Sequence, residues 1–164
     1  MAQLEAFLNL NVVPWEEAIL RLVLAMLFGL MLGLDRDTKN KPVGFRAFMI
    51  VSTTTCLMAM VGVELSAAQA SARDGTGLDL AKIISGVLTG IGFLGAGAIL
   101  HGKGKQVIGA ATGASIWACG GIGLALGFGL YLFALFGFVA IGIILVVGGW
   151  LQVPINGETD DEEK

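Results

Sequence analysis

The amino-acid sequence predicts an all-α membrane protein, a bundle of five transmembrane helices with the N-terminus outside and the C-terminus in the cytoplasm. Hydrophobic residues make up 55% of the chain and charged residues only 14%, and the mean hydropathy is +0.83. These values lie outside the usual range of soluble domains. Uncharged stretches long enough to cross a bilayer recur along the chain, and positive charge gathers in the loops on one side of them.

Five apolar stretches define the predicted helices. They cover residues 18–34, 47–65, 83–100, 107–126 and 130–151. The loops after the first and third stretches hold six cations, namely Arg36, Lys39, Lys41, Arg46, Lys103 and Lys105, whereas the loop after the second holds Arg73 and Lys82. This excess predicts that the first and third loops are cytoplasmic. We expect residues 1–157 to form one membrane domain and the acidic residues 158–164 to be a disordered tail.

The first stretch begins beside an acid and a base one helical turn apart. Glu17 and Arg21 have the i,i+4 spacing of a helical ion pair, with the arginine stem reaching toward the outer interface. The alternative is that Arg21 points into the bundle, where an ionised residue marks a functional site.

The second stretch carries small polar side chains on one helical face. This face includes the hydroxyl groups of Ser52 and Thr55 and the thiol of Cys56. Interhelical packing is one interpretation of these groups. The alternative is a polar path across the membrane, formed by Ser52, Thr55, Thr89 and Thr112.

The third stretch is rich in glycine. Its glycines are Gly86, Gly90, Gly92, Gly95 and Gly97. Small residues let membrane helices approach closely, so we interpret this stretch as a packing helix. The alternative is a broken helix whose freed carbonyl groups contact a cation. The pattern Gly-x-Gly-x-x-Gly at residues 90–95 does not indicate a dinucleotide site, since no acid follows it before Glu158.

The last two stretches are separated only by Gly127-Phe128-Gly129, which predicts a tight antiparallel hairpin. No plausible base accompanies a nucleophile at membrane depth, so we expect no enzymatic activity. Mg²⁺ usually binds carboxylates, and the acids outside the tail and the N-terminal region lie near span ends, at Asp35, Asp37, Glu64, Asp74 and Asp79. We expect the lipid bilayer as the surroundings, no nucleic-acid partner, and no cofactor other than Mg²⁺.

Two blocks of sequence resemble the signatures of the MgtC/SapB family. The first is Leu-Gly-Leu-Asp-Arg-Asp-Thr-Lys-Asn-Lys-Pro-Val-Gly-Phe-Arg at residues 32–46, which is similar to the family's cytoplasmic loop. The second comprises residues 90–100, 107–109 and 112–117, which resemble the second family signature in order and spacing. Together they extend from the first span to the fourth.

The resemblance implies two groups of site residues. Asp35 stands at the family's acid, and Arg36 and Arg46 stand at its two arginines, so these three are expected to form a charged cytoplasmic cluster. Asp79 and Lys82 resemble an acid and base that precede the third span, here in the outer loop. The sequence departs from the family pattern at four positions, Ala47, Leu80, Ala111 and Gly113.

The resemblance also implies a location and a role. The location is the bacterial inner membrane, and the role is magnesium homeostasis and growth at low magnesium, associated in pathogens with survival inside host cells. Two functions stay open: transport of an ion such as Mg²⁺, or regulation through binding another membrane complex such as the ATP synthase. We expect a short member of the family without its soluble C-terminal domain. A homodimer through the small-residue faces of the third and fourth spans is also expected.

Overall fold

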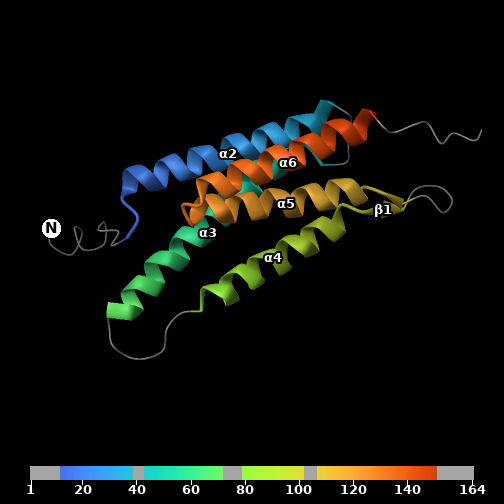
Figure 1. The fold of residues 1–164 in the computed structure, drawn as a ribbon. Coiled ribbons are helices and arrows are strands. Elements are labelled where there is room, and N and C mark those ends of the chain that lie inside the picture. Colours follow the sequence, from blue (N-terminus) through green and yellow to red (C-terminus); the bar gives the residue numbers. More distant parts are fainter. Residues whose placement is uncertain (1–11, 39–42, 72–78, 102–106, 151–164) are drawn as a thin grey trace, which may run out of the picture.

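The computed structural model is a bundle of five long helices (Figure 1). It describes residues 12–38, 43–71, 79–101 and 107–150, so the acidic tail lies outside the described residues. The helices are α2 (Trp15–Thr38), α3 (Phe45–Ser71), α4 (Leu80–Gly97), α5 (Ala110–Gly127) and α6 (Tyr131–Trp150). All five are long and apolar enough to cross a membrane, which confirms the five predicted spans.

The connection between α4 and α5 differs from the prediction. Residues 100, 107 and 108, which were expected in helices, lie instead in two short antiparallel strands, β1 (Leu100–His101) and β2 (Val107–Ile108). The physical reason is Gly109, whose φ of 97° lies in the left-handed region. A helix cannot run through that conformation, so α5 begins only at Ala110.

Close contacts fix the relative directions of the helices. Gly29 of α2 lies against Phe48 of α3, and four residues later Gly33 lies against Phe45, so these helices are antiparallel. By the same reasoning α3 and α5 are parallel, because Gly123 meets Ser52 and Gly127 meets Cys56. Helix α5 contacts each of the other four helices and is the centre of the bundle.

Helix α5, rather than α4, contains most of the tightly packed glycines. A Cβ atom on Gly123 would overlap Thr55 Oγ1 and the carbonyl oxygen of Ser52, and one on Gly127 would overlap the carbonyl oxygen of Cys56. In α4 only Gly95 makes such an approach, with Gly113 of α5.

The prediction that the glycines of α4 pack against neighbouring helices is wrong for four of them within this chain. No atom of another helix lies within 4 Å of the position that a Cβ atom would take at Gly86, Gly90, Gly92 and Gly97. The sequence pattern alone does not distinguish the inward from the outward face of a helix that is apolar all round. Within one chain, therefore, Gly95 is the only glycine of α4 that packs closely against another helix, whereas other contacts of α4 use side chains, such as Ile91 against Gly120 of α5.

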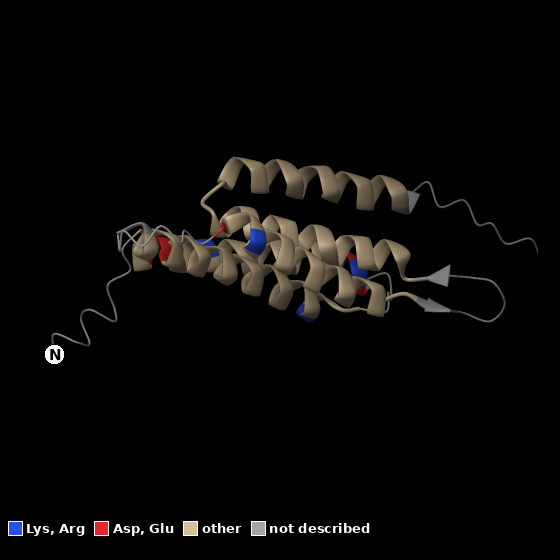
Figure 2. Cartoon of the chain, turned by 90° about the horizontal axis from the view of Figure 1, so that it is seen from below, with Lys and Arg blue, Asp and Glu red and all other residues tan. Residues whose placement is uncertain are grey.

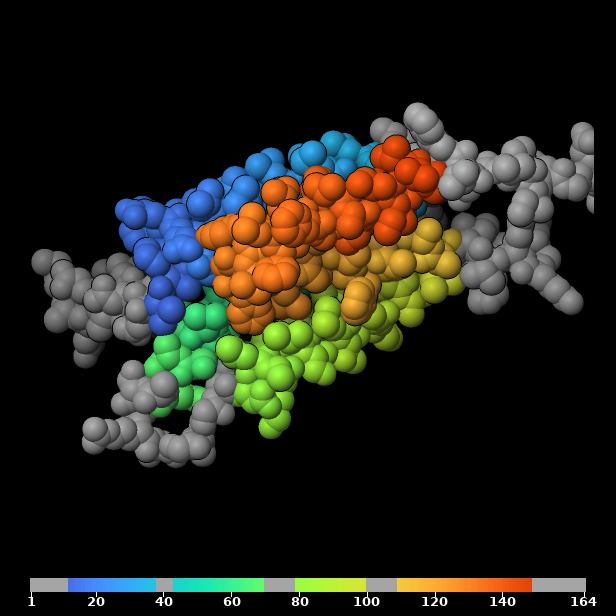
Figure 3. Space-filling model, viewed as in Figure 1, coloured from blue at the N-terminus to red at the C-terminus, as the bar shows by residue number. Residues whose placement is uncertain are grey.

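The hairpin between α5 and α6 is confirmed. Helix α5 ends at Gly127 and α6 begins at Tyr131, and Gly129 takes a φ of 75° in the turn. Phe138 of α6 stacks on Phe28 of α2 with ring centroids 4.6 Å apart. Otherwise α6 lies on the outside of the bundle, where Figure 3 shows its broad open face.

The contact between α5 and α3 yields a stability prediction. We expect Gly123→Ala to lower the free energy of unfolding by about 1–3 kcal/mol, because the added methyl group overpacks a closed contact. Gly121→Ala is the matched control, since no atom lies within 4 Å of its Cβ position, and it should be neutral or slightly stabilising. Thermal unfolding in detergent measures both, and equal midpoints would contradict the proposed role of Gly123.

Candidate functional site

The buried polar residues of the bundle lie on three helices only. Among the described residues the buried polar and charged side chains are Arg21, Arg36, Ser52, Thr55, Thr112 and Ser115. All belong to α2, α3 or α5, and we call this set the polar seam. Helices α5 and α6 contain no Lys, Arg, Asp or Glu, and Figure 2 shows how few charged residues the bundle carries. The charges of the seam are Arg21 and Arg36 of α2.

At one end of the polar seam, Arg21 is surrounded by acceptors. Its guanidinium donates to Glu17 Oε1 at 2.5 Å and to the carbonyl oxygen of Gly127 at 2.6 Å. It also lies 3.3 Å from the hydroxyl of Tyr131, which donates to Glu17. Gly127 ends α5, so the arginine neutralises the negative end of that helix dipole. The predicted Glu17–Arg21 pair is confirmed, and Arg21 is also buried in the bundle, with 8% of its surface exposed.

In the middle of the polar seam the hydroxyl of Thr55 and the nearby thiol of Cys119 bond to backbone, whereas Ser52 Oγ is buried without a hydrogen-bond partner. Thr55 Oγ1 donates to the carbonyl oxygen of Ser52 at 3.0 Å, and Cys119 Sγ lies 3.4 Å from the carbonyl oxygen of Phe48. Because Gly123 closes against Ser52 and Thr55, the helices leave no room there for a hydrated ion in this conformation.

At the other end of the polar seam, Arg36 reaches α5. Its Nη2 donates to Ser115 Oγ at 3.0 Å, and that hydroxyl donates to the carbonyl oxygen of Ala111. Arg36 has 6% of its surface exposed, and its Nε is buried without a hydrogen-bond partner. Within the described residues Arg36 makes no ion pair.

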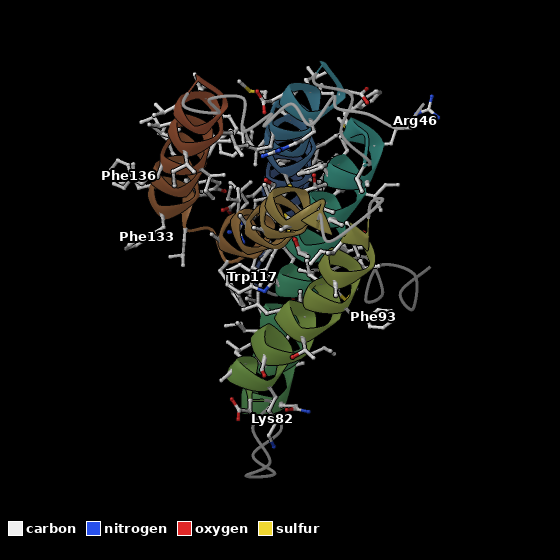
Figure 4. All side chains as sticks on the ribbon, turned by 90° about the vertical axis from the view of Figure 1, so that its right-hand side faces the viewer. Arg46, Lys82, Phe93, Trp117, Phe133 and Phe136 are labelled. Atoms are coloured by element: carbon white, nitrogen blue, oxygen red, sulfur yellow. The ribbon has the colours of Figure 1, made fainter. Side chains whose placement is uncertain are left out.

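The structure separates the members of the predicted charged cluster. Arg36 is inside the bundle, whereas Arg46, the second residue of α3, is exposed and points away from it (Figure 4). Asp35 is half-buried on α2 beside Arg36. At the opposite end of the bundle, exposed Asp79 caps α4 by accepting the N–H of Ala81, and Lys82 is exposed in the first turn of that helix.

The structure also divides the predicted polar path. Ser52, Thr55 and Thr112 belong to the polar seam, but Thr89 is exposed on α4 and donates back to the carbonyl oxygen of Ser85. It borders an open groove of about 510 Å³ between α4 and α5. The residues lining this groove are Ala81, Ile84, Ser85, Leu88, Thr89 and Trp117.

Sequence reasoning missed the insertion of Arg36 between α2 and α5. A signal was present, because Arg21 and Arg36 are 15 residues apart and about four helical turns place both on the same side of α2. For a resident metal, the described part of the chain offers no group of three His, Cys, Asp or Glu side chains. The chemistry available in the polar seam is hydrogen bonding by hydroxyl and guanidinium groups.

The network around Arg21 yields a second stability prediction. We expect Arg21→Met to lower the free energy of unfolding by about 1–3 kcal/mol, because the carbonyl of Gly127 and the carboxylate of Glu17 lose their charged donor. Tyr131→Phe, which removes one hydroxyl, should cost about 1 kcal/mol. Arg46→Met is the control at an exposed site and should leave thermal unfolding in detergent unchanged. An Arg21→Met midpoint equal to that of the control would contradict the role of this network.

Comparison with known sequences supports the resemblance. The MgtC family profile matches residues 22–153. An uncharacterized protein of Haemophilus influenzae is 40% identical over 66% of this chain and 46% of its own length. A protein of Escherichia coli K12 with the name "Putative magnesium transporter YhiD" is 33% identical over 80% of this chain and 60% of its own length. Protein MgtC of Salmonella typhimurium is 33% identical over 85% of this chain and 58% of its own length.

The chain thus spans about half the length of the curated relatives that it matches. No solved structure matches it. The five apolar helices and the match to the MgtC family profile establish a multi-pass membrane protein. Both sequence blocks of the predicted resemblance fall within the matched residues, and the chain belongs to the MgtC family.

Proposed function

We propose that this protein resides in the bacterial inner membrane, with its N-terminus outside, and serves magnesium homeostasis by binding another membrane protein. In this proposal it does not conduct Mg²⁺ through its own helices. The name of the Escherichia coli relative, a putative magnesium transporter, supports the link to magnesium. The excess of cations in the two loops predicted to be cytoplasmic supports the orientation.

The observation that carries the proposal is the closed polar seam. Mg²⁺ requires near-octahedral oxygen coordination and gives up its water reluctantly. The hydroxyl of Thr55 is already bonded to backbone, and the buried hydroxyl of Ser52 lies where Gly123 packs without space against α3. At one end of the seam the buried guanidinium of Arg36 makes no ion pair within the described residues, and its charge repels a cation.

The outer faces of α4 and α6 support a binding role. Phe93 of α4 is 81% exposed, and Gly86, Gly90 and Gly97 leave an open surface beside it. In Figure 4, Phe93 of α4 and Phe133 and Phe136 of α6 point away from the bundle. Small residues on a membrane helix allow a neighbouring helix to pack closely. A second copy of this chain is an alternative occupant of the α4 face.

Magnesium transport is the second candidate function. The name of the Escherichia coli relative favours it, as do the buried hydroxyls of Ser52, Thr55 and Thr112. It requires a conformation in which α5 separates from α3, so that the polar seam admits an ion.

A flux assay distinguishes the two candidates. We expect the purified protein in liposomes with an entrapped magnesium indicator to give no flux above empty liposomes, with or without an imposed potential. A protein known to carry Mg²⁺ serves as the positive control. Flux that is lost in Thr55→Val but kept in Thr89→Val, which lies outside the seam, would overturn the proposal and establish transport.

A growth assay tests the binding surface. In a bacterial strain whose growth at low magnesium depends on this protein, we expect Gly90→Leu to abolish growth although the variant folds, because the side chain blocks the open face of α4. Gly142→Leu on α6 is the matched control, also with open space at the Cβ position, and should support growth. Thermal unfolding of both purified variants verifies folding, and growth with Gly90→Leu would contradict a role for the α4 face.

A further inference from the structure

Helix α4 lies at the edge of the bundle and leaves one side open along its length (Figure 1). Its main contacts are with α5 and α3. On the opposite side, exposed residues recur every three or four positions from the N-cap to the last residue, so they share one side of the helix. These residues are Asp79, Lys82, Gly86, Gly90, Phe93 and Gly97, and we call them the open face of α4. No atom of another described element lies within 4 Å of the Cβ position at any of the three glycines.

The shape of the open face is complementary to itself. Phe93 is 81% exposed, more than any other large apolar side chain of the described residues, and its ring points away from the bundle (Figure 4). Gly90 stands one turn before it and Gly97 one turn after it on the same side. A ring between two glycines forms a knob beside two shallow positions, and the same surface on a second helix offers the matching holes.

The charges at the start of α4 are also complementary to themselves. Asp79 and Lys82 are both exposed, and within the described residues neither forms an ion pair. Asp79 accepts the N–H of Ala81 as the helix cap, which leaves its negative charge without a cation. When two parallel copies of this helix face each other about a two-fold axis, Asp79 of each copy lies beside Lys82 of the other. Another protein would need a matching pair of charges, whereas a second copy of this chain brings them.

We propose that the open face of α4 binds the same face of a second copy of this chain, as a parallel helix pair about a two-fold axis normal to the membrane. Two copies in one membrane have the same orientation, because the sequence sets it, so their α4 helices run parallel. The glycines let the two backbones approach, and Phe93 of each copy lies over glycines of the other. The charged pairs determine the register of the two helices more than the affinity.

This inference rests on the binding role proposed above for the outer faces of α4 and α6. In the dimer, α4 joins the two copies, and each α6 presents its exposed phenylalanines to the other membrane protein. Of the two spans with small residues, α5 does not contribute to the dimer, because its closely packed glycines already contact other helices of the same chain. These glycines are Gly113, Gly120, Gly123 and Gly127.

Oxidative crosslinking in membranes of cells that produce the full chain tests the proposal. Phe93→Cys puts a thiol at an exposed position of the open face, where the two-fold axis brings equal positions together. A disulfide requires Cα atoms within about 7 Å of each other. We expect a covalent dimer from Phe93→Cys and none from Phe133→Cys, the matched control at an exposed phenylalanine of α6. No dimer from Phe93→Cys, or equal amounts from both variants, would overturn the proposal.

An exchange of charges tests the parallel arrangement. Asp79→Asn retains a good N-cap residue and leaves only cations at this end of the face, whereas Lys82→Glu leaves only acids. In the Phe93→Cys background we expect each variant alone to crosslink about two- to fivefold less. Produced together with tags of different size, the two variants should crosslink to each other as well as unchanged chains do. Arg46→Glu, at an exposed cation outside α4, should change nothing. Equal crosslinking by every combination would overturn the parallel pairing.

The growth assay with Gly90→Leu separates this inference from the proposed function. If Phe93→Cys gives no dimer while Gly90→Leu still abolishes growth at low magnesium, another protein occupies the open face, and the inference fails although the binding function stands. If Phe93→Cys gives the dimer and Gly90→Leu prevents it without an effect on growth, the inference holds and the role of α4 in the binding function fails.

Discussion

The close approach of α5 to the backbone of α3 is the interaction on which the rest of the structure depends. Gly123 and Gly127 place the two helix backbones in direct contact, and α5 in turn contacts every other helix. Between apolar helices in lipid, association depends on such van der Waals contact and on interhelical hydrogen bonds, because burial from water contributes little. Glycine at these positions therefore decides how the whole bundle assembles.

The position of α5 also determines what happens to the charges of α2. Helix α5 carries no charged residue of its own, and it offers a carbonyl end to Arg21 and a hydroxyl near its start to Arg36. The antiparallel arrangement of α2 and α5 makes the first contact electrostatically favourable, since a guanidinium neutralises a helix C-terminus. The same arrangement places Arg36 beside the first turns of α5, where it donates to the hydroxyl of Ser115.

The bundle combines a closed interior with open outer faces. Its buried polar groups lie on α2, α3 and α5, whereas α4 and α6 expose phenylalanine side chains and α4 exposes glycines as well. A protein that conducts ions needs the reverse arrangement, with polar groups lining an accessible path. The proposed binding function follows from this contrast.

The sequence by itself determined the five helices, the hairpin at residues 127–129, the Glu17–Arg21 pair and the family, because hydropathy, turn residues and i,i+4 spacing are local properties. Only the tertiary structure decided which glycines pack and which arginine enters the bundle. Gly123 proved to be a contact residue and Gly90 an open one, and Arg36 is buried while Arg46 is exposed. The physical reason is that a membrane helix is apolar on all faces, so its rotation about its own axis is fixed by packing against neighbours and not by a polar stripe.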